Sequence, residues 1–256
     1  MSAIANLAQL AGVSTTELFV IICAALAAGV VRGFAGFGLS AILMASIALI
    51  IPPIELIPIC YLLEGTASLV MFRGGLKEAD MKIVWGLVIG GLIGLPIGLL
   101  VTTGVDVELS KLLALILILL LTFAQFMKFK PKFLATRAGL YLSGITAGIA
   151  TGIASIGGMV VALYVLASNA EPKKMRASLV MYLCIGMFTS LFYYLGYGIM
   201  TKDALVRGLI LAPLIVIGVG IGSLLFRPQY EYLYKRSCLT LLALLSFAGI
   251  VRLINF

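Results

Sequence analysis

"VRGFAGFGLS", residues 31–40, places an arginine and three glycines inside one of the most apolar parts of the chain. Long aliphatic side chains precede and follow this stretch, so a membrane helix would be expected to run through it. Glycine lets the backbone leave helical geometry at little steric cost. The stretch therefore predicts a helix break at membrane depth, directly after a basic side chain.

The composition is that of an integral membrane protein. Hydrophobic residues make up 62% of the 256 residues, charged residues 11%, and the mean hydropathy is +1.21. The apolar blocks run without alternation, mostly for about 17–25 residues, which is the length that a helix needs to cross a hydrocarbon core of roughly 30 Å. We therefore expect an all-α integral membrane protein. The first apolar segment lacks the features of a cleaved signal peptide, so we expect it in the mature protein.

Ten apolar segments are expected, and the second of each group of five is short. The segments are Glu17–Val31, Leu39–Ile51, Ile54–Phe72, Ile83–Thr102, Leu109–Met127, Ala138–Ile153, Gly157–Ser168, Ala177–Met200, Leu209–Phe226 and Ser237–Ile254. The two short ones, Leu39–Ile51 and Gly157–Ser168, could cross fully or form re-entrant hairpins.

The basic residues favour ten full crossings. With ten crossings, most of the 18 basic residues fall on one side, and only Lys111, Lys202, Arg207 and Arg252 fall on the other. With two re-entrant hairpins the charges divide almost evenly. Because short cytoplasmic loops carry an excess of Lys and Arg, the first arrangement is expected, with both termini outside.

The two halves of the chain resemble each other. "GFAGFG" at 33–38 aligns with "GIASIG" at 152–157, and "YLLEGTAS" at 61–68 aligns with "YLCIGMFT" at 182–189. The predicted units are residues 1–130 and 131–256. Since each contains an odd number of crossings, the second must be inverted relative to the first, which is an architecture typical of transporters.

The two glycine-rich breaks predict an anion site. A helix that begins at Leu39 or Met159 presents unpaired N–H groups and a partial positive charge at its start. The alternative is close helix packing, which we expect for the glycines at 90–98 and 218–222. The predicted substrate-binding residues are Arg32, Gly33, Gly36, Phe37, Gly38, Ser155, Gly157, Gly158 and Tyr182.

Two ionisable residues have competing interpretations. Arg32 could supply a fixed charge to an oxyanion, or extend to the membrane surface. Glu64 lies well inside a crossing, where a carboxyl group favours its neutral form unless a cation such as Arg32 lies close. It is the candidate for proton coupling; a structural hydrogen bond to a neighbouring helix is the alternative.

Other classes of function lack the residues they need. The chain contains no histidine, and its four cysteines lie singly in apolar runs, so we expect no catalytic site, metal site or cofactor. The net charge of +8 comes from basic residues clustered in short loops, where they set membrane orientation, so nucleic acid is not an expected partner.

The segments "GVVRGFAGFGLSAILMASIALIIPP" and "GITAGIATGIASIGGMVVALYVLAS" resemble the two signatures of the TauE/SafE sulfite-exporter family. The first signature maps onto Arg32, Gly33, Phe34, Gly36, Phe37 and Gly38. The second usually reads Gly-Ile-Gly-Gly-Pro, whereas this chain has Ser155 at the first position and Met159 at the last.

The resemblance implies a transporter of small sulfur-containing anions, such as sulfite or an organosulfonate, in a bacterial plasma membrane. An anion channel, or a transporter of another small organic anion, remains the alternative. The sequence leaves both a monomer and a homodimer open.

Overall fold

The structure is a computed structural model and describes residues 9, 12–129, 131–167, 171–225 and 231–254. Within these residues the regular elements are helices, and no strand occurs. They are α2 (Thr15–Ala35), α3 (Leu39–Ile47), α4 (Pro53–Glu78), α5 (Met81–Gly104), α6 (Val107–Phe126), the 3₁₀ helix η1 (Lys132–Ala135), α7 (Arg137–Ala154), α8 (Gly157–Ala167), α9 (Pro172–Gly196), α10 (Lys202–Leu225) and α11 (Glu231–Ile254).

Seven of the described helices are long and apolar enough to cross a membrane: α2, α4, α5, α6, α9, α10 and α11. The prediction of an all-α membrane protein is therefore confirmed. In contrast, α3 has 9 residues and α8 has 11. At 1.5 Å per residue they extend roughly 14–17 Å, about half of a hydrocarbon core.

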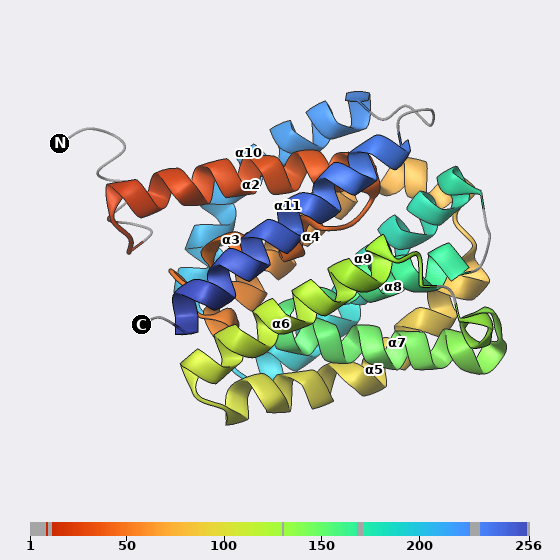
Figure 1. Cartoon of the computed structure of the whole chain (residues 1–256), viewed down its shortest axis with the longest axis horizontal. Coiled ribbons are helices and arrows are strands. Elements are labelled where there is room, and N and C mark those ends of the chain that lie inside the picture. The colour runs from red at the N-terminus through yellow and green to blue at the C-terminus, as the bar shows by residue number, and fades with distance from the viewer. Residues whose placement is uncertain (1–8, 10–11, 130, 168–170, 226–230, 255–256) are drawn as a thin grey trace.

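The long helices pack in two close pairs, α5 with α7 and α10 with α2. In Figure 1 these pairs form opposite long edges of the molecule, with α4, α9 and the short helices between them. Glycine permits the close approach: a Cβ atom at Gly94 would lie 1.9 Å from the carbonyl oxygen of Ile145, and one at Gly222 would lie 2.0 Å from that of Val30. The prediction that the glycines at 90–98 and 218–222 serve helix packing is confirmed at Gly94 and Gly222.

One end of the molecule joins the α4–α5 turn to the start of α9. Asp80 caps α5 and forms an ion pair with Lys174, with 3.1 Å between Oδ2 and Nζ. Ser178 accepts a hydrogen bond from the N–H of Asp80 at 2.9 Å. Burial raises the pKa of Asp80, but hydrogen bonds from Lys174 and from the N–H of Ile83 outweigh it and leave the pKa below its ordinary value. The carboxylate therefore stays charged and paired at neutral pH.

The other end joins the start of α2, the end of α3 and the starts of α4 and α10. Residues from all four elements line one small apolar pocket, among them Leu18, Ile47, Leu56 and Leu211. Arg207 and Glu55 form an ion pair beside it, with 2.9 Å between Nη1 and Oε2. Although α3 is short, its C-terminal end thus reaches the end of the molecule where α2 begins.

Candidate functional site

The first break is a three-residue turn that joins α2 to α3. Gly36 ends α2 with φ +81°, and Gly38 precedes α3 with φ +94°. Both values lie in the left-handed region, where a side chain is strained. A Cβ atom at Gly36 would also lie 2.8 Å from Cγ of Arg176, a residue of the second half of the chain. Helix α3 then begins at Leu39, as predicted.

The second break differs in the residue that bends it. Ser155 ends α7 with φ +57°, which is an uncommon conformation for a residue with a side chain. This is the position where the resemblance leads one to expect glycine, and the left-handed backbone gives the physical reason. Helix α8 begins at Gly157, where the predicted segment Gly157–Ser168 begins and two residues before the predicted helix start at Met159.

Gly33 and Gly152 do not belong to the breaks, which corrects the expectation that the whole glycine-rich stretch leaves helical geometry. Gly33 lies inside α2, where a Cβ atom would be 2.3 Å from the carbonyl oxygen of Val219. Gly152 lies inside α7, where a Cβ atom would be 2.5 Å from the backbone nitrogen of Leu99. Both positions require glycine because a neighbouring helix packs against them.

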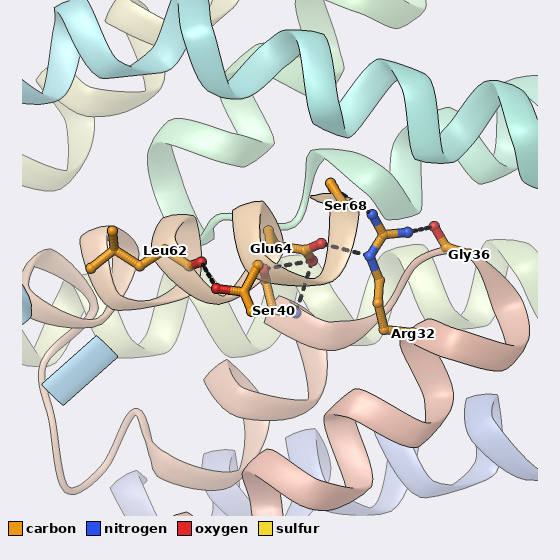
Figure 2. A network of polar contacts seen from close by, with 7 residues as sticks. Arg32, Gly36, Ser40, Leu62, Glu64 and Ser68 are labelled. Atoms are coloured by element: carbon orange, nitrogen blue, oxygen red, sulfur yellow. Dashed lines mark hydrogen bonds and ion pairs between the residues drawn. The ribbon is translucent and has the colours of Figure 1, made fainter. Parts of the chain in front are cut away.

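Arg32 is the centre of a buried polar network (Figure 2). Its guanidinium group donates to the carbonyl oxygen of Gly36 through Nη1, and to Oγ of Ser68 through Nη2 at 3.0 Å. Its Nε lies 2.8 Å from Oε2 of Glu64. The side chain of Arg32 is 0% exposed and that of Glu64 is 13% exposed. The guanidinium group of Arg32 is therefore enclosed by the protein, which favours a role inside the protein over an extension to the membrane surface.

The start of α3 contributes to the same network. Oε1 of Glu64 accepts hydrogen bonds from the backbone N–H of Ser40 at 3.3 Å and from its hydroxyl at 2.9 Å. A carboxylate at the N-terminus of a helix is stabilised by the exposed N–H groups and the helix dipole. The donors expected for an external anion at this helix start are thus in contact with a carboxylate of the chain itself.

Sequence reasoning identified Arg32 and Glu64 but missed Ser40 and Ser68. Ser68 lies one helical turn after Glu64 on α4, and Ser40 is the second residue of the predicted helix start. These spacings could have indicated them.

Arg176 is a further residue that the sequence analysis did not select. It donates to the carbonyl oxygen of Gly33 and lies 3.5 Å from Oγ of Ser223 on α10. It belongs to the start of α9, so the turn after α2 is contacted by arginines from both halves of the chain.

The predicted residues of the second half lie in two places. Gly158 faces the first break: a Cβ atom there would lie 3.6 Å from Cβ of Phe37. Tyr182 instead lines a cavity of about 20 Å³ with Thr151, Gly186, Thr189 and Ser190, which has room for about one water molecule.

In the repeat alignment, Thr151 corresponds to Arg32 and Thr189 to Ser68. The charged position of the first half, Arg32, therefore carries a hydroxyl group in the second half, whereas the hydroxyl position, Ser68, carries a hydroxyl group in both.

These features define an all-helical, multi-pass membrane protein with a buried charged site at a helix break. The family model described as "Sulfite exporter TauE/SafE" matches residues 21–248. The chain therefore belongs to the TauE/SafE sulfite exporter family, a family of membrane transporters and not of enzymes. Comparisons with curated proteins and with solved structures find no significant match.

Proposed function

We propose that this protein is a secondary transporter of small sulfur oxyanions, such as sulfite or an organosulfonate, across the bacterial inner membrane. The observation that carries the proposal is Arg32, a fully buried arginine in the last turn of the candidate membrane helix α2, beside the helix break. Arginine stays charged in proteins and presents forked donors that match an oxyanion. An ionisable side chain at such depth is costly and is by default functional.

The proposed architecture is two inverted five-segment repeats, residues 1–130 and 131–256, with ten crossings. The helix pairing supports it. The close pairs α5 with α7 and α10 with α2 each join the fourth helix of one half to the first helix of the other. In the same way α4 packs on α9, third on third, and α6 on α11, fifth on fifth. Exchanging the halves leaves this set of contacts unchanged, as a two-fold axis in the membrane plane requires.

The proposed orientation puts the end that contains Lys174 and Arg176 in the cytoplasm and both termini outside. Lys111 and Arg252 line one groove with Leu49, so basic residues assigned to the outside lie at one end of the molecule. The excess of positive charge at the opposite end supports the cytoplasmic assignment.

Transport in this proposal follows alternating access, with the anion held near the starts of α3 and α8. Phe37 and Gly158 bring the two breaks close together, and both helix starts can contribute partial positive charge. Arg32, Ser40 and Ser68 are buried, so the described conformation is closed to solvent at this point. One group of helices must move against the other to admit an anion from either side.

The proposed energy source is a proton gradient, with Glu64 as the proton carrier. Glu64 is the carboxylate in contact with Arg32, and the residue aligned with it in the second half is Ile185. One such carboxylate gives at most one proton per cycle at this site.

Proteoliposome transport tests the function. Vesicles containing the wild-type protein should take up sulfite or sulfoacetate faster than protein-free vesicles, with saturation. Arg32→Gln should reduce uptake at limiting substrate by about tenfold or more, because a charge-assisted hydrogen bond contributes about 1.5–3 kcal/mol. Arg207→Gln, which removes a paired arginine at the far end of the molecule, should retain uptake.

Equal rates for wild type and Arg32→Gln would contradict the proposal, as would no uptake of either anion by the wild type. Accumulation against a concentration gradient, driven by an imposed pH gradient, separates a transporter from the alternative of a channel. A channel lets each anion only follow its own electrochemical gradient.

A further inference from the structure

The donors around Arg32 are occupied by a side chain of the protein. Each carboxylate oxygen of Glu64 contacts different donors. Oε2 lies 2.8 Å from Nε of Arg32, and Oε1 accepts hydrogen bonds from the backbone N–H and the hydroxyl group of Ser40. Figure 2 shows the carboxylate between the guanidinium group and the start of α3. An external oxyanion that needs Arg32 and the helix start must therefore compete with Glu64.

The guanidinium group is anchored independently of Glu64. Its Nη1 bonds to Gly36 and its Nη2 to Ser68, while Nε faces the carboxylate. Nε and Oε2 have no further hydrogen-bond partner among the described residues. Departure of the carboxylate would thus free Nε and the two donors of Ser40, and Gly36 and Ser68 would hold the guanidinium in place. A sulfite or sulfonate group presents three oxygens, enough to take these donors.

Charge balance limits what can replace Glu64. The ion pair is neutral, whereas a bound anion beside an ionised Glu64 would give the buried guanidinium group of Arg32 two anionic partners in a low-dielectric site, which is disfavoured. For a singly charged oxyanion, such as hydrogen sulfite or methanesulfonate, a proton on Glu64 restores the balance: one anion enters, one proton from solvent binds the carboxyl oxygen, and Arg32 keeps a single anionic partner.

Among the described residues, Glu64 is the carboxylate that forms an ion pair with Arg32. The other charged and titratable groups that interact with the pair are Cys60 on α4, and Cys184 and Arg176 on α9. Glu78 interacts with Arg176. On α3 the neighbour is the hydroxyl of Ser40. Within the described residues, Glu64 is therefore the proton acceptor that this site provides.

We propose that the transported oxyanion binds Arg32 and Ser40 by displacing the Glu64 carboxylate, and that Glu64 takes up one proton in the exchange. The inference rests on the proposed function and deepens it: it adds Ser40 as a ligand of the anion and Ser68 as the residue that positions Arg32. It also makes anion binding and proton binding the same event, so neither is carried efficiently without the other.

Calorimetry of the wild-type protein tests the exchange without any variant. Methanesulfonate suits the test because it is a monoanion whose charge is constant between pH 6 and pH 8. Titrations in buffers of different ionisation enthalpy give the number of protons taken up. The expected result is about one proton per anion, with a dissociation constant that rises about tenfold per pH unit. Binding with no proton uptake overturns the proposal.

Variants of Glu64 and Ser40 provide a second test of the exchange. Glu64→Gln should bind methanesulfonate with an affinity independent of pH, and at pH 8 more tightly than the wild type by tenfold or more. Glu55→Gln, the same change on the same helix but in the peripheral ion pair with Arg207, should keep the wild-type pH dependence. In the Glu64→Gln background, Ser40→Ala should weaken binding about two- to tenfold, because a hydrogen bond to the anion is lost.

The outcomes separate the two proposals. If Glu64→Gln binds the anion with the pH dependence of the wild type and with no gain in affinity, the proposed exchange is wrong. The proposed transport function is not contradicted by that result. Failure of the wild type to bind sulfite, sulfoacetate and methanesulfonate at pH 6 contradicts the proposed function itself.

Discussion

Neutralising Arg32 and Glu64 singly and together tests how the ion pair contributes to stability. Breaking a buried pair by removing one partner costs about 3–5 kcal/mol, whereas replacing both charges can be close to neutral. The two single variants should also differ from each other. In Glu64→Gln a guanidinium group that is 0% exposed loses its counter-ion and cannot give up its proton. In Arg32→Gln the remaining carboxyl group is 13% exposed and can bind a proton.

We therefore expect the order of stability to be wild type, then the double variant Arg32→Gln/Glu64→Gln, then Arg32→Gln, with Glu64→Gln lowest. A loss of about 3–5 kcal/mol for Glu64→Gln corresponds to a fall of roughly 6–20 °C in melting temperature for a domain of this size. Arg32→Gln should lose less, and less still at low pH. Sulfoacetate should raise the melting temperature of Glu64→Gln more than that of the wild type, because it supplies the missing anion.

The assay is thermal unfolding in detergent, followed by a fluorescent maleimide that reacts with the buried thiols of Cys60 and Cys184 as they become exposed. Two results would refute the reasoning. One is a double variant that loses the sum of the two single losses, since independent sites add. The other is single variants that both melt within a degree or two of the wild type, since a paired charge at this depth would then contribute nothing.

Two further predictions concern the backbone and the topology. Ser155→Gly should stabilise the protein by about 1 kcal/mol, because the left-handed conformation costs a residue with a side chain roughly 1–2 kcal/mol and glycine much less; a lower melting temperature would show that the hydroxyl group of Ser155 is needed. In a cysteine-free background, Lys202→Cys should react with an impermeant maleimide in intact cells and Lys174→Cys should not, because we place Lys202 outside and Lys174 in the cytoplasm; the reverse pattern would invert the proposed orientation, and labelling of both would contradict ten crossings.

The helices were largely predictable because the membrane imposes their length and composition. Continuous apolar runs identified the long helices and the two short ones. The bounds were less accurate where charged residues end an apolar run but not the helix. The third segment was expected to end at Phe72, yet α4 continues to Glu78 through Arg73 and Lys77. Hydropathy marks the hydrocarbon core, whereas the helix extends beyond it into the polar interface.

The network around Arg32 was predictable only in part. Charged residues are rare in apolar runs, so the sequence indicated Arg32 and Glu64 as candidate site residues, each independently of the other. Their contact depends on how α2 and α4 pack, and the contribution of Ser40 depends on the direction in which α3 leaves the turn at Gly36–Gly38. A serine in an apolar run can have many structural roles, so the hydrogen-bond partner of Ser40 could be assigned only from the arrangement of the helices.

The proposed site can be tested most directly by a crystal structure of the wild-type protein grown with selenite, the heavier analogue of sulfite, at pH 5.5. Our account predicts an anomalous peak within hydrogen-bond distance of Nε of Arg32 and the N–H of Ser40, with the carboxyl group of Glu64 moved away from both. Glu64 still bound to Arg32 and Ser40, with selenium located elsewhere in the molecule, would contradict it.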